Sequence, residues 1–277
     1  MGMRVTTNIA ALNAQRNLMQ SQRGASKSMA QLASGSRINI SADDAAGLAI
    51  SERLKAGIRS ARQANRNAND GISMVQTAEG GLNEIGNIVT RLRELGIQSA
   101  SDTVGSTERG FADKEVQQLK SEIQRIALST KWGDSNLLDG TTPTFDFQVG
   151  VFNKAEEDRI SFNSAQNVAT LDALGLADLD YNTKEGAQEA LSMLDTAQNS
   201  VNGMRSDLGA LQNRLTSTVD NLGVMEENMS ASNSRIRDTD VAMASSEMTR
   251  NNILLQASTS TLAQANASSQ LALKLIG

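Results

Sequence analysis

A long alternation of apolar residues at spacings of three and four is the feature that most constrains how this chain can fold. From Leu194 to Ile236, eleven of thirteen positions at this spacing are apolar, and no proline interrupts them. The spacing keeps one stripe of a helix against a partner helix, as in coiled coils. At about 1.5 Å per residue the helix would be roughly 65 Å long, which predicts a rod or a helical bundle. The thirteen positions are Leu194, Ala197, Val201, Met204, Leu208, Leu211, Leu215, Thr218, Leu222, Met225, Met229, Ser232 and Ile236.

The same spacing continues toward the C-terminus, where eight of eleven positions from Val241 to Ile276 are apolar. Further leucines lie outside this stripe, so the apolar face is too wide for one partner helix to cover. Asp238 and Asp240 precede the stretch, and a short carboxylate there can accept hydrogen bonds from the free N–H groups of a helix start. We therefore expect a break between two helices near residues 236–240.

The N-terminal half shows a similar order of helices. A first, weakly apolar helix runs to about Ala33, a second begins after residues 41–44 and ends near Gln98, and a third covers Ala112 to Ile126. Four glycines between residues 71 and 86 interrupt the second helix, each costing about 1 kcal/mol relative to alanine, so packing against neighbours must compensate. These glycines are Gly71, Gly80, Gly81 and Gly86.

The period changes after Gly140, which indicates a small β region. Apolar and polar residues alternate from Phe145 to Val151 and again around Ile160, which predicts a hairpin. Four of the five phenylalanines lie between residues 145 and 162, so we expect the aromatic part of the core there. The predicted fold is mainly α: a long antiparallel helical hairpin or coiled-coil bundle with a small β-hairpin region, in which the N- and C-termini are paired.

Composition argues against an enzyme. The chain has no cysteine and no histidine, which removes thiolate chemistry, the commonest general base and the commonest metal ligands. Asp43 and Asp44 are adjacent carboxylates, but a helix cap explains them better than a metal. The acidic run Glu156–Asp158 is most simply a solvated face. We therefore expect no catalytic residue, cofactor or metal.

Charge is unevenly distributed along the chain. Residues 1–66 carry 10 basic and 3 acidic side chains, residues 67–234 carry 12 and 25, and residues 235–277 carry 4 and 3. An acidic middle repels phosphate, which argues against nucleic-acid binding. No stretch is apolar enough to span a membrane, and residues 1–17 lack the apolar core of a secretory signal.

Several motifs resemble those of bacterial flagellins, and they occur in the same order. The resemblance covers roughly residues 1–140 and 186–277. At the N-terminal end it rests on the stretches Asn13–Leu18, Leu32–Asn39, Ser41–Ile50, Asn65–Ser73 and Gln76–Gly80. At the C-terminal end it rests on Leu211–Leu215, Glu227–Asn228, Ser234–Asp238 and Leu262–Asn266.

The resemblance implies a structural subunit that polymerises into the extracellular flagellar filament for swimming and is exported unfolded by the flagellar type III system. Its implied partners are other copies of itself, an export chaperone, and the cap and junction proteins. Only about 45 residues separate the third helix from the C-terminal one, so the resemblance implies a minimal flagellin without variable outer domains. The implied domains are 1–43 and 237–277 (the two halves of a terminal coiled-coil domain), 44–140 (N-terminal rod helices), 141–185 (small β region) and 186–236 (C-terminal rod helix).

The terminal segments, 1–34 and 240–277, have apolar faces that a single chain cannot cover. We expect them to be disordered alone and to fold on assembly. Eight residues are predicted to form these polymerisation coils. They are Val5, Ile9, Leu12, Met19, Met248, Leu255, Leu262 and Ile276.

Flagellins are also recognised by a host Toll-like receptor. The receptor's contact region in the family resembles Thr90–Gln98 together with Glu115, so Arg91, Leu95 and Glu115 are the candidate contacts. Packing between subunits is the alternative role for these residues. Gly96 departs from the alanine or larger residue common at its position, which would soften that helical turn.

Three other functions compete with that of a filament subunit. A hook–filament junction protein of the same superfamily shares the terminal coils without forming a long polymer. A zinc peptidase carried by some flagellins needs a His-Glu-x-x-His motif, which a histidine-free chain excludes. A secreted helical effector or adhesin would not need matched apolar stripes at both termini.

Overall fold

The computed structural model describes residues 7–141 and 144–274, and within them the chain is mainly helical. Its contacts divide the chain into two compact units. Unit 1 contains residues 1–57 and 228–277, and unit 2 contains residues 58–227. Helices α2 (Ala45–Ser99) and α5 (Lys184–Arg237) each contribute residues to both units.

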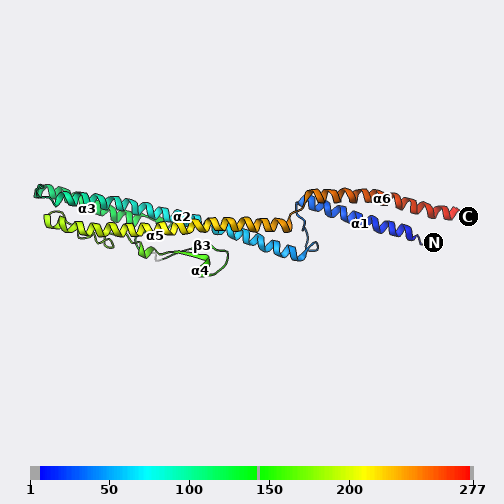
Figure 1. Cartoon of the computed structure of the whole chain (residues 1–277), viewed down its shortest axis with the longest axis horizontal. Helices are drawn as coiled ribbons and strands as arrows, with labels where there is room; N and C mark the ends of the chain where they lie inside the picture. Colours follow the sequence, from blue (N-terminus) through cyan, green and yellow to red (C-terminus); the bar gives the residue numbers. More distant parts are fainter. Residues whose placement is uncertain (1–6, 142–143, 275–277) are drawn as a thin grey trace. The chain divides into compact units, whose positions relative to one another are not determined.

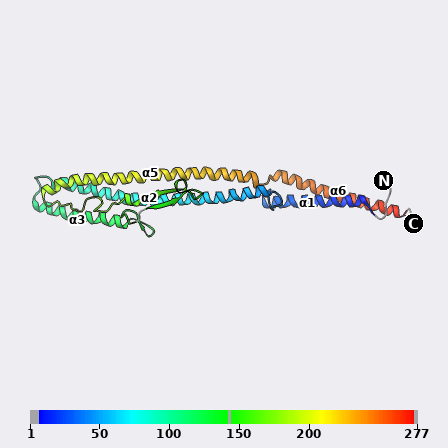
Figure 2. The ribbon, with the colours of Figure 1, turned by 90° about the horizontal axis from the view of Figure 1, so that it is seen from below.

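Unit 2 is built on antiparallel packing of α2 and α5, which run side by side in Figures 1 and 2. Arg62 pairs with Glu226 near one end of the unit and Arg93 pairs with Asp195 further along, as antiparallel helices require. The predicted stripe of α5 is the buried one, which confirms the sequence prediction. Its members at every seventh position are 0–6% exposed: Leu194, Val201, Leu208, Leu215 and Leu222.

A third helix, α3 (Ser106–Ser129), folds back beside α2 and α5 and completes the core. Val116, Ile123 and Ala127 on its inner face are fully buried. Lys120 also points inward, and its Nζ donates to the backbone oxygens of Ala177 (2.7 Å) and Leu179 (3.2 Å). The ammonium group thus ties α3 to the loop that precedes α5.

The glycines of α2 differ in what surrounds them. A Cβ on Gly81 would lie 2.7 Å from Oγ1 of Thr130 and 2.9 Å from Cδ1 of Leu138, so the loop after α3 approaches the bare backbone. On Gly71 it would lie 3.1 Å from the ring of Phe147. Nothing lies within 4 Å of a Cβ on Gly80. Close packing therefore explains some of these glycines and leaves Gly80 without a steric reason.

The β region contains two hairpins. The predicted one is confirmed: β3 (Phe145–Gln148) pairs antiparallel with β4 (Arg159–Phe162), and Phe145 stacks on Phe162 with ring centroids 6.1 Å apart. Its predicted extension through Val149 and Val151 is wrong, because β3 ends at Gln148. The sequence also did not reveal the two-residue strands β1 (Lys131–Trp132) and β2 (Ser135–Asn136), which are too short to show an alternation.

The connection between β3 and β4 contains the short helix α4 (Ala155–Asp158), and Asp158 there is buried. Its carboxylate accepts hydrogen bonds from the backbone N–H groups of Lys154 (2.9 Å) and Phe152 (3.4 Å). The prediction that the whole acidic run is a solvated face is therefore wrong for this residue. Its carboxylate closes the turn instead.

Aromatic side chains are less concentrated than their positions in the sequence suggested. Phe162 is buried in the predicted β patch, but Phe152 is 67% exposed. The single tyrosine, Tyr181, is fully buried outside the patch, where its hydroxyl donates to the backbone oxygen of Leu92 at 2.9 Å. The prediction of one aromatic patch was therefore incomplete, because a lone tyrosine carries no periodic signal.

Unit 1 pairs the two terminal helices, α1 (Ile9–Ser34) and α6 (Val241–Lys274), which confirms the predicted pairing of the chain ends. The pair is antiparallel: Nδ2 of Asn8, at the start of α1, donates to the backbone oxygen of Ala265 near the far end of α6 at 2.9 Å. At the other end of the pair, Ser36 and Asp238 form an isolated antiparallel bridge.

Two of the four predicted caps in unit 1, Asp44 and Asp240, are confirmed, whereas Asp238 belongs to the bridge with Ser36. Oδ1 of Asp240 accepts hydrogen bonds from the N–H groups of Ala242 (2.9 Å) and Met243 (3.1 Å), and Oδ1 of Asp44 accepts one from Gly47 at 2.8 Å. Asp43 instead forms an ion pair with Lys27 at 2.9 Å. That contact, with backbone N–H groups of the preceding loop, holds the pKa of Asp43 below its usual value.

Over residues 7–141 and 144–274, no helix has the length and apolar character needed to cross a membrane. Within the same described residues, no three side chains of the metal-binding types cluster closely enough to hold an ion.

Gly80 and Gly81 give a matched test of close packing in α2. We expect Gly80→Ala to raise the free energy of unfolding by up to about 1 kcal/mol, because alanine is the better helix former. We expect Gly81→Ala to lower it by about 1–3 kcal/mol, because the added methyl group overlaps Thr130 and Leu138. Urea unfolding followed by circular dichroism measures both. Equal increases in the free energy of unfolding of the two variants would contradict the close packing at Gly81.

Tyr181 should report on the core of unit 2 at alkaline pH. Burial raises its pKa to about 12, and the charge of Asp113 adds to the effect. Because the folded-state pKa exceeds the usual value of about 10, this contribution to stability is complete below pH ~10 and is lost as pH rises through the folded pKa. The tyrosinate ultraviolet absorbance of this single-tyrosine chain should therefore appear near pH 12 when folded and near pH ~10 in denaturant. A folded midpoint near the denatured one would show that the ring is accessible to water.

Candidate assembly and recognition surfaces

The inner face of α6 follows the stripe predicted from the sequence. Met248, Leu255 and Leu262, three of the predicted coil residues, are half-buried against α1, and Ala244 is 5% exposed. These residues are therefore used within one chain, to pair its two ends. Large apolar side chains elsewhere on α6 remain at least 45% exposed: Val241, Met243, Ile253 and Leu254.

The inner face of α1 consists of small residues. Those buried against α6 are Ala14, Ser21, Ala25 and Ser28, at spacings of seven, four and three. Small side chains let the two helix backbones approach closely, but they bury little apolar area. The sequence contains this pattern of small residues, but the larger apolar residues of α1 predicted a different face as the packed one.

The large apolar residues of α1 lie on the face turned away from α6. Ile9 is 57% exposed, Leu12 is 50% exposed and Met19 is 49% exposed. The remaining two predicted coil residues, Val5 and Ile276, lie outside the described residues. The structure thus divides the predicted set: its α6 members pair the chain ends, and its α1 members form an exposed apolar face.

A second candidate surface lies where α2 and α3 are adjacent in unit 2. The guanidinium of Arg91 bonds Oε2 of Glu94 at 2.9 Å and Oε1 of Glu115 at 3.0 Å. Glu94, followed by Glu115, raises the pKa of Arg91 above its usual value. Arg91 and Glu115 are about half exposed, so the structure brings these two predicted residues together at the surface.

Leu95, the third residue of that prediction, is 4% exposed and belongs to the core of unit 2. A Cβ on the neighbouring Gly96 would lie 3.2 Å from Leu191 and 3.3 Å from the hydroxyl oxygen of Tyr181. The glycine that departs from the family pattern therefore makes room for the tyrosine that bonds Leu92. Leu95 and Gly96 support the surface from below and do not enlarge it.

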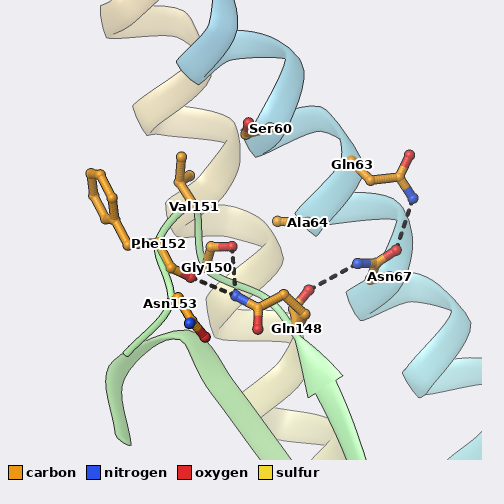
Figure 3. Close-up of a pocket in the computed structure, with 9 residues that line it drawn as sticks. All are labelled: Ser60, Gln63, Ala64, Asn67, Gln148, Gly150, Val151, Phe152 and Asn153. Atoms are coloured by element: carbon orange, nitrogen blue, oxygen red, sulfur yellow. Dashed lines mark hydrogen bonds between the residues drawn. The ribbon is translucent and has the colours of Figure 1, made fainter. Parts of the chain in front are cut away.

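A groove lies between α2 and the turn after β3 (Figure 3). Nδ2 of Asn67 donates to the backbone oxygen of Gln148, and Nε2 of Gln148 donates to the backbone oxygens of Gly150 (3.1 Å) and Phe152 (2.9 Å). These bonds hold the turn against the helix, and Phe152 stands at its outer edge. The groove holds no charged group and offers no catalytic constellation.

Comparison with known proteins decides the family. Residues 5–142 match the bacterial flagellin N-terminal helical region, and residues 191–276 match the bacterial flagellin C-terminal helical region. The chain belongs to the bacterial flagellin family. It is 43% identical over 272 residues to a flagellin of Halalkalibacterium halodurans, which covers 98% of this chain and 99% of that protein.

Solved structures agree with this assignment. Bacillus cereus flagellin is similar with a TM-score of 0.50 and 29% identity, over 57% of this chain and 88% of that one. A putative flagellar hook-associated protein from Vibrio parahaemolyticus has a TM-score of 0.58, over 71% of this chain and 100% of that one. Its 13% identity shows a shared fold and nothing more about function.

Family membership confirms the main functional predictions. Flagellins are structural proteins and not enzymes, and they polymerise with copies of themselves into the extracellular filament. This chain is therefore a filament subunit. For a flagellin, the exposed apolar residues of α1 and α6 are the natural places to look for contacts between subunits.

Replacing Leu12 tests whether this α1 face is used in assembly. Because Leu12 is half exposed and lies outside unit 2, Leu12→Asn should leave the fold of unit 2 in the isolated subunit unchanged. If a neighbour buries the side chain, losing about 1.5–3 kcal/mol of burial should raise the critical concentration for polymerisation about tenfold or more. Sedimentation of filaments grown on seeds measures it. Gln20→Asn, an exposed polar site on the same helix, is the control. An unchanged critical concentration for Leu12→Asn would remove this face from the contact.

Proposed function

We propose that this flagellin forms the filament through its terminal helices and that unit 2 provides the surface recognised by a host receptor. The observation that carries the first part is the exposed apolar face of α1, at Ile9, Leu12 and Met19, on a helix already paired with α6. Exposed apolar residues aligned on one helix are typical of a surface that a partner covers. The sedimentation experiment on Leu12→Asn tests this part.

This proposal assigns a role to each segment of the chain. Residues 1–43 and 237–277 form the terminal coiled-coil domain, residues 44–140 and 186–236 provide the rod helices, and residues 141–185 form its small β region. The helix ends at Ser34 and Arg237, with the bridge between Ser36 and Asp238, support a change of structure close to both domain boundaries.

Export as an unfolded chain through the flagellar type III system fits the composition. The chain has no cysteine, so no disulfide has to be broken, and it has only one proline. The small inner face of α1 gives the terminal pair little stability of its own, so the ends are readily kept unfolded before assembly. An export chaperone would cover the apolar residues of α6, and the cap and junction proteins would meet the same terminal surfaces at the filament ends.

A hook–filament junction protein is the second candidate function. It rests on the terminal coils that such proteins share with flagellins, while the high coverage by a flagellin at 43% identity favours the filament subunit. Growth of long filaments from the purified chain on seeds distinguishes the two, because a junction protein would not elongate them.

Receptor recognition is proposed for the surface around Arg91 and Glu115, with Leu95 fixing the helix beneath them. An exposed arginine held between two carboxylates is a preorganised contact, because its planar donors are already oriented. This support comes from the geometry together with the family resemblance.

Arg93 supplies a matched control for this proposal. It lies two residues from Arg91 and is also about half exposed, but it pairs with Asp195 on α5. We expect Arg91→Ala and Glu115→Ala to weaken Toll-like receptor binding about tenfold or more each, as loss of a central interface contact does. Arg93→Ala should change it much less. Surface plasmon resonance on folded monomers measures the difference. Equal, small effects in all three variants would reject this surface as the receptor contact.

A further inference from the structure

The polar residue on the inner stripe of α6 has a specific counterpart on α1. Asn251 occupies a position of the stripe and is half-buried. The only glycine in the sequence of α1 is Gly24, where an added Cβ would lie 2.8 Å from Nδ2 of Asn251 and 3.0 Å from its Cγ and Oδ1. The amide of Asn251 therefore occupies the space that the absent side chain of Gly24 leaves.

The rest of the pair specifies its register weakly. The buried residues of α1 are alanines and serines, and the inner residues of α6 repeat every seven positions, as Met248, Leu255 and Leu262 and as Ser258 and Ala265. Residues repeated every seven positions meet similar residues after a shift of one heptad. Such a shift moves α6 along α1 by about 10 Å, at 1.5 Å per residue. These repeats alone would tolerate it.

Asn251 would not tolerate this shift. One heptad from Gly24 in either direction, α1 presents Asn17 or Gln31, and neither leaves the bare backbone that Gly24 offers to a side-chain amide. A contact between Asn251 and either of these side chains would push the two helices apart and lose the close packing seen at Gly24. In the observed register, by contrast, the bond from Asn8 to Ala265 and the bridge at Ser36 also form.

We propose that Asn251, seated against Gly24, fixes the register of α1 against α6 and thereby gives every subunit the same terminal surface. The proposal rests on polymerisation through the terminal helices. The outward residues of α1 and α6, such as Leu12 and Ile253, move relative to each other when the pair shifts. A helical polymer requires identical surfaces on all subunits, so a register error would be an assembly error. A single asparagine in the apolar seam of a coiled coil specifies the register of other helix pairs.

Distance measurement between two spin labels tests the proposal directly. The chain has no cysteine, so Arg16→Cys on α1 and Ser246→Cys on α6 place the labels at two exposed sites only. These sites are offset along the pair, so a one-heptad shift changes their separation by up to about 10 Å. Labelled chains are diluted into excess unlabelled wild-type chain and assembled on seeds. Pulsed electron resonance then reports the distance within single subunits.

We expect one narrow distance for the wild-type sequence and two or more for Asn251→Leu. Asn252→Leu is the matched control, because Asn252 is exposed on the same helix, and its distance should stay single. Exclusion of Asn251→Leu from filaments that admit Asn252→Leu would equally support the proposal. A single unchanged distance in incorporated Asn251→Leu would overturn it. Failure of the wild-type chain to elongate seeds would instead contradict polymerisation itself.

Exchanging Gly24 and Asn251, which leaves the amino-acid composition unchanged, provides the second test. Gly24→Asn and Asn251→Gly should each broaden the distance distribution, because one creates a clash and the other leaves a gap. The double variant places asparagine on α1 opposite glycine on α6, so it should restore a single distance. A double variant as broad as Asn251→Gly alone would show that the contact does not set the register.

Discussion

The antiparallel packing of α5 on α2 is the interaction on which the rest of unit 2 depends. Every seventh residue of α5 from Leu194 to Leu222 is almost fully buried, so one stripe supplies a continuous line of apolar contacts. A helix of this length cannot be stable in water by propensity alone, and α2 also carries several glycines. The α3 helix, the β hairpins and the loop with Tyr181 all pack on this pair of helices, and the pair therefore fixes their positions.

The terminal helices in unit 1 follow the same antiparallel plan with different chemistry. Their inner surface is built of alanine, serine and glycine on one side and of partly covered methionine and leucine on the other. Such a pair gains little from burial within one chain, while its outer faces keep large apolar residues exposed. This is the expected composition for a segment whose stability comes from neighbouring subunits. The two units therefore differ in what covers their apolar residues. Unit 2 buries them within one chain, and unit 1 leaves its outer apolar faces for neighbouring subunits.

The spacing of apolar residues along the sequence made most of the architecture predictable. The stripe of α5, the helix ends at Ser34 and Ser99 and the caps at Asp44 and Asp240 all follow local rules that a sequence expresses directly. The errors occur where a single side chain decides. Asp158 looks like part of an acidic run, yet it closes a turn by accepting backbone hydrogen bonds. Tyr181 has no periodic partners in the sequence, yet it is buried over Gly96.

The sequence by itself determined that this is a mainly helical, self-pairing chain without cysteine or histidine, because periodicity and composition are properties of the residues alone. Only the tertiary structure decided which face each helix uses. Ile9, Leu12 and Met19 point away from α6, Leu95 lies beneath the surface of Arg91 and Glu115, and Gly24 receives Asn251. The physical reason is that a stripe of apolar residues indicates only that a helix packs against a partner. Which helix becomes that partner, and in which register, depends on the shapes of both surfaces.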